Sequence, residues 1–212
     1  NREAAKYFYS CLMNPKTPQG LEYFTKKRGF SLPLIKRFGM GYAPEGWNGL
    51  RDHLKSKGYS YEQMLQANLI QKSREKESYY DVFRNRVMVP ILDVSGNVIA
   101  FGGRLLEDGK QPKYLNTSDT PAFRKSKNLF ALNFAKDYCS DRMILCEGYM
   151  DVIALHGAGF SNAVATLGTA MSPDHARMMK RYTKSVVISY DADTAGQNAA
   201  DKAFRLLGEV GL

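Results

Sequence analysis

Two short apolar runs in the C-terminal third of the chain each end in carboxylates. The first run, Met143–Cys146, is followed by Glu147, and the second, Val186–Tyr190, is followed by Asp191 and Asp193. β-Branched runs bounded by Gly or Asp are typical of strands buried on both faces of a parallel sheet. Such sheets bind their ligands just beyond the carboxyl ends of the strands. We therefore expect Glu147, Asp191 and Asp193 to meet at one sheet edge.

The same part of the chain alternates strand-like and helix-like segments. In order, the expected elements are strand 143–146, helix 149–156, strand 163–167, helix 173–182, strand 186–190 and helix 195–207. This alternation predicts an α/β fold, with a parallel sheet, right-handed crossovers and flanking helices. Asp151 lies one turn into the first helix, so we expect it on the same side as Glu147.

Carboxylates gathered at one edge repel one another unless they are protonated or bind a cation. Mg²⁺ and Mn²⁺ take oxygen ligands and are commonly held by one or two carboxylates together with substrate phosphates. The group therefore predicts a divalent-metal site, with Asp151 as a supporting or further ligand. The residues leave an alternative open: Asp191 and Asp193 only cap the helix that begins at Thr194.

The pattern before residue 139 is different, because helices dominate and the strands are grouped together. We expect two helices within 1–29, helices at 32–38, 47–57, 61–70 and 129–137, a polar loop at 71–78, and strands at 40–43, 82–92 and 98–106, the last two joined by a turn at 93–97. The chain is thus predicted to contain a basic α+β subdomain over residues 1–138 and a parallel-sheet subdomain over residues 139–212.

The net positive charge of the chain lies in residues 1–140. The formal net charge is +9; residues 1–140 carry 23 Lys and Arg against 13 Asp and Glu, whereas residues 141–212 carry 7 against 8. A basic surface beside paired carboxylates suits an enzyme that acts on polyanions, because the cations attract phosphates while the acids position metal. A basic surface that serves only solubility is the competing interpretation.

Several basic and aromatic residues in the centre are candidates for contact with nucleotide or DNA. Arg84, Arg86 and Arg104 lie on or beside the expected strands, and the planar guanidinium group binds phosphate oxygens in a bidentate manner. A second group follows a loop that contains Gly and Pro. It combines a cation, an aromatic ring and an amide, namely Lys113, Tyr114 and Asn116. A basic cluster that includes Lys125 comes after it.

Other classes of protein fit poorly. No apolar run approaches the length of a membrane span, and the cysteines, Cys11, Cys139 and Cys146, match neither a zinc site nor a disulfide framework. We therefore expect a cytoplasmic protein without zinc in this chain and without contact with a membrane. Because the sequence begins at Asn1 and stops at Leu212, we interpret it as a fragment of a longer protein.

Six segments together resemble the RNA polymerase core of bacterial DnaG-type primases. The Toprim domain of that family is similar to Glu147–Asp151, Thr166–Thr169 and Asp191–Gly196, and its basic half is similar to Phe83–Ile91, Phe101–Arg104 and Pro112–Asn116. The resemblance covers nearly the whole chain. It implies a Toprim-type parallel sheet preceded by a basic α+β subdomain.

The resemblance also implies an activity: RNA primer synthesis on a single-stranded DNA template from ribonucleoside triphosphates. Glu147, Asp151, Asp191 and Asp193 would bind Mg²⁺ or Mn²⁺, with Glu147, Asp191 and Asp193 catalytic. The nucleotide and template surface would comprise Arg84, Arg86, Arg104, Lys113, Tyr114, Asn116 and Lys125. Implied partners are the DNA template, the nucleotides, the RNA primer and the replicative helicase, bound through a module outside this chain, in the bacterial cytoplasm at the replisome.

One departure from the family pattern concerns the end of the chain. The family's Toprim domain carries a further acidic Asp-Pro-Asp-type motif, and the sequence stops at Leu212 before any such motif.

The sequence leaves two alternative functions open. A Toprim nuclease or topoisomerase would use the same acids to cleave DNA, and a noncatalytic nucleic-acid-binding module would use them only as helix caps.

Overall fold

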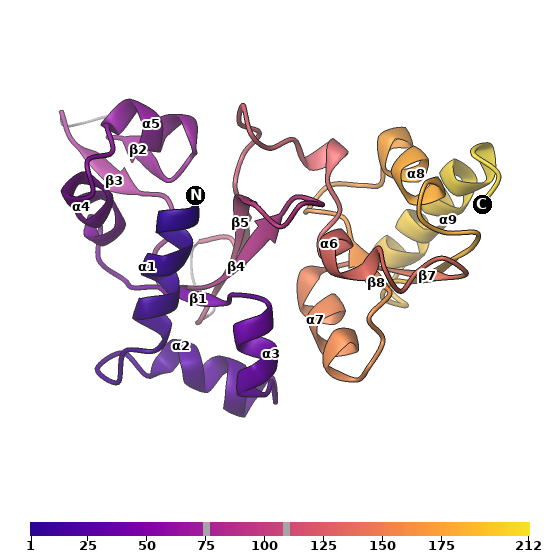
Figure 1. The fold of residues 1–212 in the computed structure, drawn as a ribbon, viewed down its shortest axis with the longest axis horizontal. Coiled ribbons are helices and arrows are strands. Elements are labelled where there is room, and N and C mark those ends of the chain that lie inside the picture. Colours follow the sequence, from indigo (N-terminus) through magenta and orange to yellow (C-terminus); the bar gives the residue numbers. More distant parts are fainter. Residues whose placement is uncertain (74–76, 108–110) are drawn as a thin grey trace. The chain divides into compact units, whose positions relative to one another are not determined.

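The computed structural model describes residues 1–73, 77–107 and 111–212, and it divides into two compact units (Figure 1). Unit one comprises residues 1–91 and 97–122, and unit two comprises residues 92–96 and 123–212. The expected boundary at 138/139 differs from this division. The segment after residue 122 packs on the second core, because Leu129, Leu132 and Ala135 are buried there against Met143 and Leu145.

Unit one combines short helices with an antiparallel sheet. Its elements are α1 (Arg2–Leu12), α2 (Gln19–Glu22), the π-helical turn η1 (Tyr23–Lys27), α3 (Leu32–Arg37), β1 (Gly41–Ala43), α4 (Gly49–Ser56), α5 (Tyr61–Gln66), β2 (Ile70–Lys72), β3 (Tyr79–Asp81), β4 (Arg86–Leu92), β5 (Val98–Leu105) and β6 (Tyr114–Asn116). Among the described residues, the larger sheet has the order β1-β4-β5-β6, and β2 pairs with β3.

The core of unit one is aromatic. Phe8 of α1 makes edge-to-face contacts with Phe83 and Phe101, with ring centroids 6.4 and 5.3 Å away. α1 approaches β1 closely, since a Cβ atom on Gly41 would lie 2.5 Å from the Cβ atom of Phe8. Only glycine permits this contact, which aligns the N-terminal helix with the sheet.

Two expected elements of unit one differ from the structure by several residues in their bounds. The helix expected over 61–70 ends at Gln66, and Ile70–Lys72 forms β2, in register with Tyr79–Asp81. The strand expected over 82–92 begins only at Arg86, because Asn85 has a left-handed backbone, with a φ of 50°. Short apolar stretches do not distinguish the end of a helix from a strand until the pairing partner is known.

Unit two is built on a parallel sheet with the order β8-β7-β9. Its elements are η2 (Lys125–Lys127), α6 (Leu132–Ala135), β7 (Met143–Cys146), α7 (Tyr149–Gly157), β8 (Ala163–Ala165), α8 (Pro173–Lys180), β9 (Val186–Ser189) and α9 (Thr194–Glu209). Figure 1 shows α7 on one side of this sheet and α8 and α9 on the other. The expected α/β fold, a parallel sheet flanked by helices, is confirmed.

One strand of this sheet is less buried than expected. β7 is the central strand and is mostly buried, but β9 lies at the edge of the described sheet and alternates between half-buried and exposed residues. Val187 of β9 is 44% exposed. The expectation that both strands are buried on both faces is therefore wrong for β9, because the apolar run in the sequence is the same for an edge strand and a central one.

Helices α3 and α5 begin at serine caps. The Ser31 hydroxyl accepts a hydrogen bond from the Leu34 amide, and Ser60 forms a reciprocal pair with Gln63. Within the described residues, no helix is both long and apolar enough to cross a membrane.

Candidate functional site

The carboxyl ends of β7 and β9 bring two of the expected acids together. The strands are parallel neighbours, with Cys146 opposite Ser189, so Glu147 leaves β7 level with the end of β9. The main-chain N–H of Asp191 donates a hydrogen bond of 3.2 Å to Oε2 of Glu147. The sequence predicts that Glu147, Asp191 and Asp193 meet at one sheet edge; the structure places the Glu147 carboxylate against the backbone of Asp191 there, and a site formed by all three acids stays a prediction. Both side chains are exposed, so the edge is open to solvent.

Asp193 is the N-cap of α9. Its Oδ1 accepts a hydrogen bond of 2.7 Å from the amide of Gly196, which satisfies one of the free N–H groups at the start of the helix. The chain turns tightly here, and a Cβ atom on Gly196 would lie 2.1 Å from the carbonyl oxygen of Asp191. Capping by Asp193 is thus observed, and capping with one oxygen does not prevent metal binding through the other.

Asp151 reaches back to the start of its own helix. Its Oδ2 accepts a hydrogen bond of 3.2 Å from the amide of Gly148, the residue after Glu147. Asp151 therefore caps the start of α7 next to the residue that follows Glu147, and its place as a metal ligand stays a prediction. Burial raises the pKa of the neighbouring Cys146 thiol to about 12, and the charge of Asp151 adds to the increase. Cys146 remains a protonated, structural thiol at neutral pH.

The acids supply the correct donor atoms for a hard cation. Carboxylate oxygens without nearby thiolate or imidazole ligands fit Mg²⁺ or Mn²⁺ better than zinc. In the part of the chain that the structure describes, no group of three or more His, Cys, Asp or Glu side chains is arranged to hold a metal ion. Glu147, Asp151 and Asp193 instead accept hydrogen bonds from main-chain amides. The donor chemistry of these carboxylates fits a divalent metal.

Arg86 is buried, in contrast to its expected place on a nucleotide surface. The residue is 1% exposed, and its guanidinium group donates hydrogen bonds to the carbonyl oxygens of Gly103, Pro112 and Lys113, at 3.5, 2.8 and 3.3 Å. These bonds tie β4 to β5 and to the segment before β6. This position favours a structural role for Arg86 over direct contact with phosphate.

Gly103 leaves space for the buried side chain of Arg86. A Cβ atom there would lie 3.0 Å from Cδ of Arg86 and 3.1 Å from the ring of Phe83. Gly103 pairs in regular register with Leu115, so it marks no bulge, and it makes room for a buried arginine.

Arg104 is also buried, between two tyrosine rings. The carbon atom of its guanidinium group lies 5.0 Å from the ring centroid of Tyr23 and 5.7 Å from that of Tyr114, and the residue is 7% exposed. Cation–π contacts of this kind stabilise a desolvated guanidinium group. Arg104 therefore positions Tyr114, which is itself 45% exposed and available to a ligand.

The remaining expected residues differ in their access to solvent. Lys113 is exposed, Arg84 and Asn116 are half-buried, and all three belong to unit one. Burial lowers the pKa of the Arg84 guanidinium group. Lys125 belongs to unit two, where its carbonyl oxygen lies 2.9 Å from Nε2 of the buried His175. The basic residues are thus divided between the two units.

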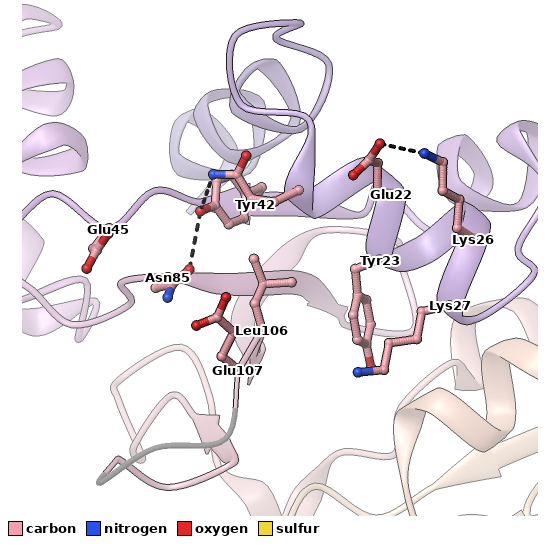
Figure 2. A pocket seen from close by; sticks show the side chains of 10 residues that line it. Glu22, Tyr23, Lys26, Lys27, Tyr42, Glu45, Asn85, Leu106 and Glu107 are labelled. Carbon is pink, nitrogen blue, oxygen red and sulfur yellow. Dashed lines mark hydrogen bonds and ion pairs between the residues drawn. The ribbon is translucent and has the colours of Figure 1, made fainter.

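A cavity of about 600 Å³ opens in unit one. Figure 2 shows its lining residues: Gln19, Glu22, Tyr23, Lys26, Lys27, Tyr42, Glu45, Asn85, Leu106 and Glu107. The hydroxyl of Tyr42 accepts a hydrogen bond from Gln19 and donates one to Asn85. Three carboxylates and two ammonium groups line the cavity, so its charge does not by itself favour a phosphate. No local sequence pattern predicts this cavity, because separate segments of the chain contribute its residues.

Sequence reasoning also missed Asp81. Its carboxylate is buried and accepts hydrogen bonds from the amides of Leu50 and Arg51, at 2.8 and 2.9 Å, at the start of α4. Burial raises the pKa of Asp81 to about 6, although these two hydrogen bonds act in the opposite direction. Asp81 is 31 residues from Leu50 in the sequence, so capping preferences between neighbours could not reveal it.

Two family models match the chain, one in each part. Residues 7–136 match the N-terminal domain of the DNA primase catalytic core, and residues 144–212 match a Toprim-like domain. The chain is 48% identical over 212 residues to the DNA primase of Clostridium acetobutylicum, and it covers 35% of that protein. It thus spans about a third of the length of that relative.

Solved structures of primases have the same fold. The Aquifex aeolicus primase structure, which contains the zinc-binding and RNA polymerase domains, matches all of this chain with a TM-score of 0.89 and 36% identity, over 51% of its own length. The structure of the DnaG primase catalytic domain bound to single-stranded DNA matches 95% of the chain with a TM-score of 0.84 and 38% identity, over 63% of its length. The chain belongs to the DnaG-type DNA primase family, as part of its catalytic core.

Proposed function

We propose that this chain forms part of a catalytic core that synthesises short RNA primers on single-stranded DNA. The observation that carries the proposal is the meeting of Glu147 and Asp191 at the ends of β7 and β9, in a chain whose whole length resembles a DNA primase. In this reaction the 3′-hydroxyl of the primer attacks the α-phosphorus of a ribonucleoside triphosphate. A P–O bond forms, and pyrophosphate leaves.

Glu147, Asp191 and Asp193 would hold the divalent metal, and Asp151 would support them from the start of α7. A bound Mg²⁺ or Mn²⁺ lowers the pKa of the attacking hydroxyl and stabilises the charge on the leaving pyrophosphate. Asp193 would bind through the oxygen that does not cap α9. In unit one, Lys113 and Arg84 would attract the phosphates of nucleotide and template, and Tyr114 would offer a ring for stacking.

The same proposal covers the partners and place of action. The template is single-stranded DNA, and the product is an RNA primer. A replicative helicase would bind through a part of the longer protein outside these 212 residues. We place this reaction in the bacterial cytoplasm at the replication fork.

The decisive test is primer synthesis by a chimaera in which this chain replaces the matching 212 residues of the C. acetobutylicum relative. The chimaera should incorporate labelled ribonucleotides on single-stranded DNA in Mg²⁺ or Mn²⁺. Glu147→Gln should abolish incorporation at an unchanged melting temperature, because the side chain is exposed. Glu209→Gln, at the exposed C-terminal end of α9, is the matched control and should retain activity. Full activity of the Glu147→Gln chimaera would remove Glu147 from the catalytic site.

A binding measurement locates the nucleotide in the isolated chain. Labelled ribonucleoside triphosphate should bind more tightly with Mn²⁺ than without it, and the Asp191→Asn, Asp193→Asn double variant should lose this metal dependence. Binding that is indifferent to both metal and substitutions would place the nucleotide on the basic unit alone. Cleavage or supercoil relaxation of DNA by the chimaera, without ribonucleotide incorporation, would favour a Toprim nuclease or topoisomerase.

A further inference from the structure

A buried histidine of unit two takes no part in the site described above. His175 lies in the first turn of α8 and is fully buried. A buried imidazole needs partners for its ring nitrogens, because an unpaired polar atom away from water costs free energy. Nδ1 accepts a hydrogen bond of 3.2 Å from the amide of Ser172, and Nε2 lies 2.9 Å from the carbonyl oxygen of Lys125. Both partners are main-chain groups.

These partners determine the form of the ring. Because Nδ1 accepts from an N–H group, the one hydrogen of the neutral ring is on Nε2, which donates it to the carbonyl oxygen of Lys125. Burial lowers the pKa of His175, although its bond to Lys125 acts in the opposite direction. The ring therefore stays neutral at pH 7 and joins α8 to η2.

Ser172 makes a second bond between the same two segments. Its hydroxyl accepts a hydrogen bond from the amide of His175, as the N-cap of α8, and donates one of 3.2 Å to the carbonyl oxygen of Ser126. Lys125 and Ser126 are the first two residues of η2. A single 3-10 turn has weak hydrogen bonds of its own, so these two bonds from α8 fix its position.

The segment that contains η2 lies at the acidic edge of the sheet. Phe130 forms an antiparallel bridge with Ala165, the last residue of β8, and Ala165 is in register with Cys146 of β7. Because the bridge is antiparallel, the residues just before Phe130 continue past the carboxyl end of β8. Glu147 leaves β7 on the same side. η2 therefore lies on the side of the sheet where the acids lie.

We propose that His175 is a positioning residue for Lys125, the lysine of η2 that we expect to bind the phosphates of the nucleotide. An ammonium group acts on phosphate as a point charge, so its effect depends on where its main chain is held. His175 fixes the carbonyl oxygen of Lys125 beside the acids that would bind the metal and the triphosphate. The histidine itself touches no nucleotide. This inference rests on the proposed function, since it assumes that nucleotide binds at the acidic edge.

Two substitutions of His175 separate the two bonds of its ring. Asparagine is long enough to accept the bond from the Ser172 amide, as Asp151 does at the equivalent position of α7, but it is too short to reach the carbonyl oxygen of Lys125. Glutamine places its amide nitrogen where Nε2 of the ring lies, so it can donate to that oxygen. His175→Asn should therefore release η2, and His175→Gln should retain it.

The readout is the KM and kcat of ribonucleotide incorporation by the chimaera described above. His175→Asn should raise the KM for ribonucleotides by about threefold to tenfold, as for the loss of one hydrogen bond, with little change in kcat. His175→Gln should recover most of this loss. Lys125→Ala should raise KM by about tenfold or more, because it removes a charged contact. Adding His175→Asn to Lys125→Ala should raise KM no further, because His175 acts through Lys125.

Two further variants separate positioning from folding. His156→Asn changes another buried histidine of unit two, whose Nε2 lies 3.0 Å from the carbonyl oxygen of Ala163, at the amino end of β8. This matched control should lower the melting temperature and leave KM unchanged. Ser172→Gly removes the bond to Ser126 with little effect on α8, because glycine is a tolerated N-cap. It should raise KM in the parent chimaera but not in Lys125→Ala, and it tests the inference even if His175→Asn does not fold.

The outcomes distinguish this inference from the proposed function. Effects of His175→Asn and Lys125→Ala that multiply in the double variant would overturn the inference, because the two residues would then act independently. An unchanged KM in Lys125→Ala, or in both His175→Asn and Ser172→Gly, would also overturn it. In each of these cases, primer synthesis by the parent chimaera leaves the proposed function intact. A parent chimaera that incorporates no ribonucleotide, under conditions in which the C. acetobutylicum relative does, would contradict both proposals.

Discussion

The backbone amide of Asp191 donates its hydrogen bond to the carboxylate of Glu147, a residue 44 positions earlier in the chain. This contact exists because β9 pairs in parallel with β7, so that the ends of the two strands are level. The position of the acidic pair therefore depends on the conformation of the short segment that joins β9 to α9. Gly196 and Asp193 determine that conformation.

Gly196→Ala should disturb the acidic pair. The new methyl group would lie 2.1 Å from the carbonyl oxygen of Asp191, so the start of α9 must move, at a cost of about 1–3 kcal/mol in the free energy of unfolding. Primer synthesis by a chimaera that carries Gly196→Ala should also fall, because the start of α9 has moved. Gly208→Ala, in the same helix with no atom within 4 Å of the added carbon, should stabilise the chain by up to about 1 kcal/mol. Chemical denaturation of both variants checks the contrast, and equal stability would refute the steric argument.

Substitutions of Asp193 should separate its two expected roles. Asparagine is as good an N-cap as aspartate, so Asp193→Asn should preserve stability but reduce metal-dependent nucleotide binding. Asp193→Ala should reduce both stability and metal-dependent nucleotide binding, and it should lower the free energy of unfolding by about 0.5–2 kcal/mol. Thermal unfolding and Mn²⁺-dependent binding of labelled nucleotide, measured on the same samples, test this pair. Unimpaired metal-dependent binding by Asp193→Asn would leave Asp193 with capping alone.

Asp81 should make stability depend on pH. Burial raises its pKa in the folded chain to about 6, above the ordinary aspartate value of about 3.9, so the folded chain retains a proton that the unfolded chain has released. The free energy of unfolding therefore falls as pH rises between about 4 and 6, by about 3 kcal/mol for this group. Urea denaturation of the parent chain and of Asp81→Asn across this range checks the effect. The difference between them should change with pH by about this amount, and parallel profiles would contradict it.

Arg86 and Lys113 should respond to substitution in opposite ways. Arg86→Lys removes the planar group that binds several carbonyl oxygens at once, so it should destabilise the fold by about 1–3 kcal/mol. Lys113→Ala should leave the melting temperature unchanged. It should make the negative slope of log affinity for single-stranded DNA against log salt less steep, by about 1. Melting curves and salt titrations of DNA binding measure both. A salt slope that Lys113→Ala leaves unchanged would exclude phosphate contact by this lysine.

Local patterns predicted the C-terminal part of the chain well. The order of strands and helices from Met143 to Glu209 follows from short β-branched runs, a Pro at the start of α8 and acids before helices. The meeting of Glu147 and Asp191 also followed from the sequence, because parallel strands always place their carboxyl ends at one edge. Periodicity and strand direction are local properties, and they carry this information without knowledge of distant contacts.

The burial of the arginines was decided only by tertiary structure. Arg86 and Arg104 have the same local signature as Arg84, but carbonyl oxygens of β5 and of the segment before β6 surround Arg86, and the rings of Tyr23 and Tyr114 surround Arg104. The pairing of Ile70–Lys72 with Tyr79–Asp81 and the capping of α4 by Asp81 likewise join segments whose partners are distant or ambiguous in sequence. The sequence alone predicted which residues have side chains suited to phosphate or metal. Only the packing of the sheets decided which of them reach solvent, because desolvation depends on every neighbour of a side chain.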